Sequence, residues 1–314
     1  YRANNWDKAG PISDKKYLNV AADITEIARN NKIEIFHASI KWFKDGIFKK
    51  AFIFRDGEWQ RAKDIKPNLI WLKMKVTQKT NFLLEELNAQ VPFLNPFPFE
   101  RLNDKSLSSK VFYRWVPKTL KITKYLELKA SFDVLKSKKL VIKPLKGSGG
   151  KGVEVIDEKE LNRFRGKKTN VITQKFIDSS HGIKGLCKGY HDLRLVFLDN
   201  KLAYSYLRVP ARGKFLANIA QGGKMTVVPK SHIPRRVMKM ANEIVGIISY
   251  YNAKYYTLDF LFDKDGRPYL LEMNTMPGAF FNKKDRADQL KFFRSLVQTI
   301  MKRIKEKEKE VEKK

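Results

Sequence analysis

The sequence predicts a mixed α/β protein of two or three lobes. The chain has 314 residues, 43% hydrophobic and 12% aromatic, which is enough apolar surface to bury a substantial core. Over about the first hundred residues, short strand-like apolar runs alternate with longer runs that have helical spacing. Turn dipeptides such as Asp56-Gly57 separate strand-like runs, as expected for β-hairpins. These three observations together favour a globular protein with sheets covered by helices.

Composition excludes several classes of protein. No apolar run approaches the ~20 residues that a membrane-spanning helix needs, so we expect no membrane partner. No signal-peptide pattern stands at the start, and the chain begins at Tyr1 without a methionine, which leaves open where the natural protein begins. The single cysteine, Cys187, rules out an internal disulfide framework and predicts a reducing, cytoplasmic location.

The formal net charge of +31 has two interpretations. A polyanionic partner, such as nucleic acid or an acidic peptide, would be attracted over long distances. Alternatively, the proteins of the source organism are generally rich in lysine. The even spread of lysine along the chain favours this second interpretation. We therefore use the charge only as an argument about electrostatic steering and solubility.

The pattern of the N-terminal third of the chain predicts a small domain there. Residues 1–17 are polar and contain Gly10-Pro11, which predicts an irregular arm. An α/β domain is expected over residues 18–100. Its expected helices are 20–30 and 77–88, and its expected strands are 33–37, 50–55, 58–60, 68–74 and 91–95.

A glycine-rich loop from Leu145 to Gly152 follows next. It joins expected strands at 138–144 and 153–156, whereas Walker and Rossmann loops lead into a helix. Glycines let backbone N–H groups surround phosphate oxygens, and Lys105 and Lys143 can add positive charge. A plain hairpin loop is the alternative, but the density of small residues beside lysines favours phosphate binding.

The remaining elements follow from periodicity and turn signals. A helix at 101–115 is expected to begin at Asn103-Asp104 and to stop before Pro117. Further expected elements are an extended segment at 118–123, a helix at 158–165, strands at 171–177, 190–198 and 201–209, and helices at 234–251 and 285–305. The charge-alternating residues 306–314 fit either a solvated helix end or a frayed tail.

Three polar residues interrupt an apolar hairpin at 257–273. Asp259 lies within its first strand, and Glu272 and Asn274, two residues apart, share a face at the end of the second. Burying acids is costly unless a charge compensates them, and Mg²⁺ prefers such oxygen ligands. These residues therefore predict a metal site, with solvent-facing acids at a strand end as the alternative.

In this order, the segments resemble the ATP-grasp ligases, and most closely the glutathione synthetase and RimK-like group. The resemblance covers about residues 95–278. Each motif alone is weak, but seven in order are specific: NDK at 103, VPKT at 116, KPLKGSGGKGV at 143, QKFI at 174, DLR at 192, R-x₆-F-x₂-N-x₃-GG at 208 and LEMNTMPG at 271.

The resemblance implies the ATP-grasp fold, in which two α+β lobes clasp ATP, preceded by a small α/β lobe. By this comparison the ATP-grasp domain spans 101–305, with a flap lobe at about 120–175 and a C-terminal lobe at about 176–305. Residues 306–314 are left as a charged tail.

Roles are implied position by position. Lys105 and Lys143 would contact the ATP phosphates, beneath a flap that includes Gly147, Ser148, Gly149, Gly150 and Gly152. The hinge that reads the adenine edge would be Gln174, Lys175, Phe176 and Ile177, where Lys175 departs from the acidic residue usual in the group. Asp178 is the ribose candidate on position alone.

The remaining implied roles concern charge. Asp259, Glu272 and Asn274 would hold one or two Mg²⁺ (or Mn²⁺) ions. Arg208 and Arg194 would face the γ-phosphate and an acyl-phosphate. Asn218 would lie near the metal and the phosphates.

The implied function is that of a RimK-like ATP-dependent carboxylate–amine ligase, acting through an acyl-phosphate on amino-acid, peptide or small carboxylate and amine substrates. A tubulin-tyrosine-ligase-like or glutathione-synthetase-like specificity is the alternative within the enzymes, and acidic peptide tails would suit the positive charge. From another class, the chain could be a non-catalytic nucleic-acid-binding protein on this scaffold. The intact acids and lysines argue against that, because an inactive scaffold has no reason to keep buried acids.

Overall fold

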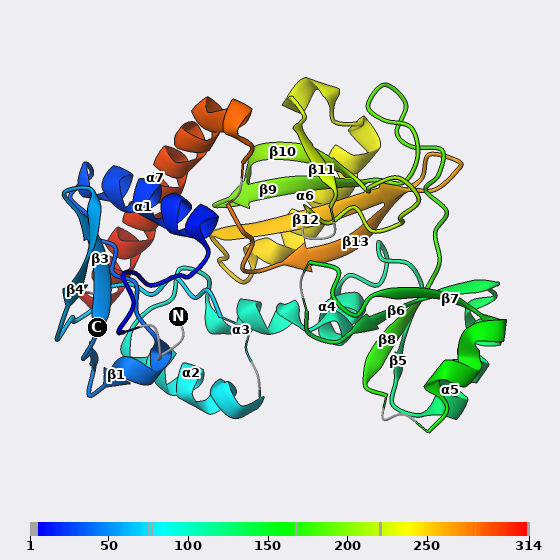
Figure 1. Cartoon of the computed structure of the whole chain (residues 1–314), viewed down its shortest axis with the longest axis horizontal. Coiled ribbons are helices and arrows are strands. Elements are labelled where there is room, and N and C mark those ends of the chain that lie inside the picture. Colours follow the sequence, from blue (N-terminus) through cyan, green and yellow to red (C-terminus); the bar gives the residue numbers. More distant parts are fainter. Residues whose placement is uncertain are drawn as a thin grey trace.

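The computed structural model describes residues 6–74, 76, 78–147, 149–166, 169–219, 222–279 and 281–312. Figure 1 shows an N-terminal region packed with the last helix at one end, a five-stranded sheet in the middle and a small four-stranded sheet at the other end. No helix in the described ranges is both long and apolar enough to cross a membrane.

The N-terminal region is built from two helices and two small hairpins. The elements are α1 (Lys15–Arg29), η2 (Ile40–Trp42), β1 (Phe43–Lys44), β2 (Ile47–Phe48), β3 (Ala51–Arg55), β4 (Glu58–Ala62) and α2 (Gln78–Gln90). Helix α1 begins inside the arm predicted to be irregular, because the Leu18 N–H already donates to Asp14 O at 2.9 Å. Residues 1–5 and Thr77, the expected start of the second helix, lie outside the described residues.

Residues 33–37, 68–74 and 91–95 do not form the strands that the sequence predicts. They make only isolated bridges, His37 to Phe52 and Ile70 to Phe93. The bridge at Ile70 is bounded by Pro67 and Pro92, which lack the N–H donor needed to extend a ladder. Apolar runs alone therefore overestimate the sheet in this region.

A connecting segment of short helices leads to the two sheets. It comprises α3 (Phe97–Glu100), η3 (Arg101–Asn103) and α4 (Lys105–Val111). The expected helix start at Asn103-Asp104 is confirmed, because the Asp104 side chain caps α4 by accepting from the Ser106 N–H at 2.9 Å and the Leu107 N–H at 3.4 Å. The predicted extent of 101–115 is wrong, since residues 101–103 form the separate η3 and α4 ends at Val111. That cap places Lys105 at the first position of α4.

The four-stranded sheet has the antiparallel order β5-β8-β6-β7. Its elements are β5 (Thr119–Ile122), α5 (Tyr125–Leu135), β6 (Lys139–Pro144), β7 (Glu154–Asp157), η4 (Glu158–Phe164) and β8 (Val171–Lys175). Alternation along β6 separates two faces: Leu140 and Ile142 join the core beneath α5, while Val141 and Lys143 face a pocket.

The five-stranded sheet has the order β11-β10-β9-β12-β13, and every neighbouring pair is antiparallel. Its elements are β9 (Asp192–Leu198), β10 (Lys201–Val209), β11 (Lys224–Val227), η6 (Lys230–His232), α6 (Arg235–Ser249), β12 (Tyr255–Phe262), β13 (Pro268–Asn274), η7 (Lys283–Asp285) and α7 (Arg286–Glu312). Strand β12 is buried along its whole length.

Alternation along β12 decides what each face of the sheet does. Tyr256, Leu258 and Phe260 pack in the core beneath α6. On the opposite face, Tyr255 packs in the core with α7, whereas Asp259 lines the pocket. One face of one strand thus contributes both to the α7 core and to the pocket.

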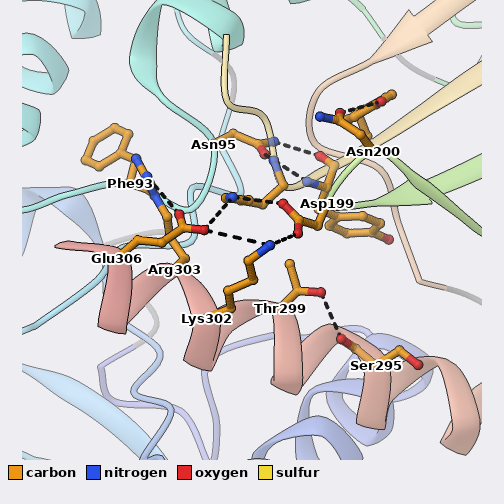
Figure 2. Close-up of polar contacts among 12 residues, drawn as sticks. Phe93, Asn95, Asp199, Asn200, Ser295, Thr299, Lys302, Arg303 and Glu306 are labelled. Atoms are coloured by element: carbon orange, nitrogen blue, oxygen red, sulfur yellow. Dashed lines mark hydrogen bonds and ion pairs between the residues drawn. The ribbon is translucent and has the colours of Figure 1, made fainter. Parts of the chain in front are cut away.

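Helix α7 continues to Glu312, so the described part of the charged C-terminal segment is helical rather than a frayed tail; Lys313 and Lys314 lie outside the described residues. Figure 2 shows how α7 is attached. Lys254, before β12, bonds Glu306 on α7 at 3.0 Å and Asp199 in the β9–β10 turn at 2.8 Å.

Candidate active site

A pocket lies between the four-stranded and five-stranded sheets. Most of the predicted site residues line it: Lys105, Lys143, Gly147, Gly150, Gln174, Lys175, Phe176, Ile177, Arg208, Asn218, Asp259 and Glu272. Residues separated by more than 150 positions in the chain therefore meet in one cavity.

The other predicted residues that the structure describes are absent from the pocket lining. They are Gly149, Gly152, Asp178, Arg194 and Asn274, and Ser148 lies outside the described residues. The Asp178 carboxylate accepts from the Ser180 N–H at 3.0 Å and shapes a turn. The ribose role implied by its position gains no support from this placement.

Two lysines form the cationic side of the pocket. Lys105 Nζ donates to Gly147 O at 3.0 Å and lies 2.8 Å from Glu272 Oε1. Lys143 is 7% exposed, and its ammonium lies 3.5 Å from Leu271 O. Burial lowers the pKa of Lys143 to about 8; the Glu272 carboxylate raises it in part, and the Lys105 ammonium lowers it further. A buried ammonium of this kind is suited to an anionic ligand.

The glycine-rich loop meets a second loop above the pocket. Gly150 has a φ of +73°, and a Cβ atom on it would lie 2.7 Å from Asn218 Oδ1. A side chain at this position would strain the backbone and displace the Asn218 side chain, so glycine is favoured here. The second loop has its own requirement, because a Cβ on Gly223 would lie 2.2 Å from Ala217 O. The two glycine-containing motifs therefore shape two loops that touch.

The predicted hinge borders an aromatic group at the pocket. Gln174 is buried, and its Nε2 donates to Thr119 Oγ1 at 2.8 Å. The Phe215 ring lies 4.9 Å from the Tyr190 ring and 6.2 Å from the Phe176 ring, centroid to centroid. Tyr190 was not predicted as a site residue, and nothing in its local sequence marks it.

Sequence reasoning also missed the apolar lining. Val141, Val155 and Leu261 face the pocket from β6, β7 and β12. A signal was available for two of them: Val141 shares the strand parity of Lys143, and Leu261 shares that of Asp259. Mixed polar and apolar walls are typical of small-ligand sites.

An alternating chain of four charges crosses three strands of the central sheet. Arg208 donates to Asp192 through Nε at 2.6 Å and through Nη2 at 2.7 Å, and to Asp259 Oδ2 at 2.8 Å. Arg194 donates to Asp259 through Nε at 2.6 Å and through Nη2 at 2.5 Å. The register makes this possible, since Arg208 pairs with Asp192 and Arg194 pairs with Asp259.

The two aspartates respond differently to the same burial. Burial alone would raise the pKa of Asp259, but the guanidinium groups of Arg194 and Arg208 outweigh it and hold the pKa below its ordinary value. For Asp192, burial outweighs the opposing effect of Arg208, and the pKa is raised. Of the two aspartates, Asp259, 1% exposed, is therefore the one held in its ionised form.

The predicted metal ligands lie on one face of the hairpin. Asp259 pairs directly with Glu272, and Thr257 pairs with Asn274, which confirms the predicted side-by-side arrangement. Within the described part of the chain, no group of three or more His, Cys, Asp or Glu side chains could hold a metal ion. A cation here would therefore rely on two carboxylates, one amide oxygen and ligand phosphates.

These three side chains fit such a cation. Asn274 has a buried Nδ2 for which the described part of the structure offers no hydrogen-bond partner. A half-turn of the amide presents its oxygen instead. Carboxylate and amide oxygens are the ligands that Mg²⁺ and Mn²⁺ accept, with phosphate oxygens and water filling the remaining positions.

The chain resembles several curated proteins over part of its length. A "Probable alpha-L-glutamate ligase" of Shewanella halifaxensis is 30% identical over 158 residues, covering 49% of this chain and 31% of that protein. The protein of the same name from Legionella pneumophila (strain Corby) is 31% identical over 144 residues, covering 44% of this chain and 43% of that protein. The matched stretch thus spans less than half the length of these relatives.

Solved structures share the fold over most of the chain. A RiPP-associated ATP-grasp ligase of Chryseobacterium gregarium, solved with ADP and a leader and core peptide, matches with a TM-score of 0.58 and 15% identity, covering 87% of this chain and 92% of that one. The D-alanine–D-alanine ligase of Bacillus anthracis, solved with ATP, matches with a TM-score of 0.54 and 18% identity, covering 76% of this chain and 81% of that one. Identities this low show the fold alone, and the fold is ATP-grasp.

The sequence model of one family matches more than half of the chain. It describes the RimK-like ATP-grasp domain and covers residues 103–292. That stretch contains α4, both sheets and every residue described in the pocket. The chain belongs to the RimK-like ATP-grasp family.

Proposed function

We propose that this protein is an ATP-dependent carboxylate–amine ligase that uses Mg²⁺ or Mn²⁺. One observation carries the proposal: a single pocket brings the buried Lys143 and the half-buried Lys105 together with the carboxylates Asp259 and Glu272. A pocket with both charges suits a metal-bound polyphosphate, because the lysines attract phosphate oxygens and the carboxylates attract the cation.

The site's groups suit phosphoryl transfer, which depends mainly on positioning and charge neutralisation. A substrate carboxylate would attack the γ-phosphorus of ATP, forming an acyl-phosphate and ADP; an amine would then attack the acyl carbon and release phosphate. When bound by Asp259, Glu272 and Asn274, the metal ion would neutralise phosphate charge. Arg208 would stabilise the charge on the transferred group, and Asp192 holds its guanidinium in place.

The two loops that touch at Gly150 and Asn218 would exclude water from the acyl-phosphate, which water hydrolyses. Gln174, Lys175, Phe176 and Ile177 would border the adenine, with Phe215 and Tyr190 closing that side. Lys175 occupies the position where the group usually has an acid, so we assign it no side-chain role towards the nucleotide.

For substrates, we propose that the amine is an amino acid, with glutamate tested first, and that the acceptor is the carboxylate of a peptide. Relatives named as probable glutamate ligases support the amine. Fold neighbours solved with precursor peptides support the acceptor. The net charge of +31 would attract an acidic peptide tail.

The same proposal includes the remaining expectations. Residues 18–100 would form a pre-ATP-grasp domain and residues 101–305 the ATP-grasp domain. A cytoplasmic location, expected from the single Cys187, stays part of the proposal.

The test is ADP release by the full chain with ATP and Mg²⁺, screened against the amino acids together with neutral and acidic peptides. Release should require both an amine and a carboxylate, and mass spectrometry should show the amide product. Glu272→Ala should abolish release, whereas the exposed Glu86→Ala on α2 should leave it unchanged. If amine-dependent ADP release persisted in Glu272→Ala, the ligase assignment would be wrong. Salt-sensitive nucleic-acid binding without ADP release under any condition would support the binding protein instead.

A further inference from the structure

Two buried polar residues lie just before the stretch that the family model matches, and the proposed mechanism uses neither. Asn95 is 4% exposed and Glu100 is 2% exposed. The matched stretch begins at residue 103. Burying a polar group is costly unless it is hydrogen-bonded, so the partners of these two side chains indicate what they do.

Asn95 uses both ends of its amide on the central sheet. Its Nδ2 donates to Tyr255 O at 2.7 Å and to Thr275 O at 2.8 Å. Its Oδ1 accepts from the Lys254 N–H and the Tyr255 N–H, both at 2.9 Å. Figure 2 shows this side chain beside the start of β12. Asn95 therefore ties the first residues of β12 to the residue that follows β13.

Glu100 holds that same residue by its side chain. Thr275 Oγ1 donates to Glu100 Oε2 at 2.5 Å. Burial raises the pKa of the Glu100 carboxyl to about 8, against the opposing effect of the hydrogen bond from Thr275. Thr275 is itself 1% exposed, so its carbonyl and its hydroxyl are both fixed inside the protein.

The position of Thr275 connects these contacts to the proposed metal site. Thr275 directly follows Asn274, the proposed amide ligand of the metal ion. On the other side of Asn274, Glu272 lies 2.8 Å from the Lys105 ammonium. Asn95, Glu100 and Lys105 belong to one short segment of the chain. That segment therefore fixes the metal-ligand end of β13 on both sides of Asn274.

We propose that Asn95 and Glu100 are positioning residues for the metal site, acting through Thr275 on the orientation of Asn274 and Glu272. This inference rests on the proposed function and deepens it, because it assigns a part in metal binding to residues outside the family-matched stretch. Residues that hold metal ligands in place commonly change metal affinity about 10- to 100-fold when they are removed.

The test measures metal binding directly, without turnover. Binding of Mn²⁺ to the full chain in the presence of ADP is followed by electron paramagnetic resonance, at a temperature where each variant is folded by circular dichroism. Glu100→Ala and Thr275→Val should each weaken Mn²⁺ binding about tenfold, and the double variant should lose little more, because both remove one contact. Glu100→Gln keeps a hydrogen-bonding oxygen and should restore most of the affinity.

Thr299→Val is the matched control for Thr275→Val. Thr299 is also a buried threonine with a single hydroxyl bond, to Ser295 O at 2.9 Å, but it lies on α7. The Thr299→Val variant should have a lower unfolding temperature but the same Mn²⁺ affinity as the wild type. Wild-type affinity in Glu100→Ala and Thr275→Val, with a lowered unfolding temperature, would overturn the proposal and leave these residues a purely structural role.

The outcomes separate this inference from the proposed function. A wild-type chain that binds Mn²⁺ with ADP but never forms an amide would overturn the ligase activity and leave the positioning role standing. A wild-type chain that binds no Mn²⁺ with ADP would overturn both. Unchanged affinity in the variants of an active ligase would overturn the positioning role alone.

Discussion

Two ionic networks, each with a buried basic residue, lie at opposite ends of the same five-stranded sheet. At one end, Arg208 and Arg194 alternate with Asp192 and Asp259 across β10, β9 and β12. At the other end, Lys254 lies between Asp199 and Glu306 and joins the β9–β10 turn to α7. Figure 2 shows Lys302 of α7 in contact with the same Asp199. The interactions are of the same kind, with similar distances.

The difference lies in what surrounds them. Lys254 is 2% exposed, and Lys302 and Arg303 of α7 complete its network by contacting the same two acids. None of these residues lines the candidate active-site pocket. The network at the other end opens onto that pocket and stands beside Lys143, whose pKa burial depresses. The two networks therefore differ in one respect that bears on ligand binding: only the arginine–aspartate network faces a cavity.

The largest effect that would sharpen this contrast is expected from Asp259→Asn. Removing the anion from the proposed metal site should lower ADP release about a thousandfold, equivalent to about 4 kcal/mol of transition-state stabilisation. Asp199→Asn removes an anion from the other network and should leave the rate per folded molecule unchanged. Steady-state kinetics on both variants checks this. Equal losses of activity would show that the two networks do not differ in function.

Lys254→Met is expected to lower stability without affecting ATP binding. This change removes the buried cation that Asp199 and Glu306 share, but both acids are part-exposed and keep contacts with Lys302 or Arg303. It should therefore lower the free energy of unfolding by about 1 to 2 kcal/mol. The KM for ATP should stay the same, because the network lies away from the pocket. Urea unfolding and steady-state kinetics measure the two quantities. An unchanged unfolding midpoint would mean that this network does not anchor α7.

Lys143→Met should have opposite effects on stability and binding. A buried ammonium with a depressed pKa costs folding energy, so the nucleotide-free variant should be more stable by about 1 to 3 kcal/mol, since one pKa unit corresponds to about 1.4 kcal/mol. Its ATP affinity should fall at least about tenfold, because a charge that contacts phosphate is lost. Calorimetric titration with ATP and urea unfolding test both parts. A variant that is less stable in the absence of nucleotide would contradict the argument.

The smallest effect concerns pH. The pKa of Lys143 in the folded state, about 8, lies below its ordinary value of 10.5. Between these values the unfolded chain binds the proton and the folded chain does not, so this residue makes stability rise with pH from about 8 to 10.5. ATP affinity should fall as pH rises through about 8. Lys143→Met should lack both dependences, and titrations at pH 7 and pH 9 compare the two proteins.

Short-range sequence patterns determined much of the secondary structure of this protein. The hairpin of β12 and β13, the helices α6 and α7 and the glycine-rich loop follow from spacing and turn residues, which act within a few positions of one another. Asp259 and Glu272 were predicted to meet because one turn joins their strands, and the register confirms it. The ordered motifs also indicated the family, which the match over residues 103–292 confirms.

Tertiary structure decided what depends on distant partners. The two arginines that bond Asp259, Arg194 and Arg208, lie 65 and 51 residues before it in the sequence. No local spacing pattern predicts such distant contacts. The contact of Gly150 with Asn218 and the hydrogen bond of Thr275 to Glu100 could not be predicted either, because both depend on how distant segments pack. In the N-terminal region, apolar runs predicted strands that find only single bridges, because a strand needs a neighbour with free N–H groups. Local chemistry specifies elements and the types of ligand, and long-range packing specifies which charges meet.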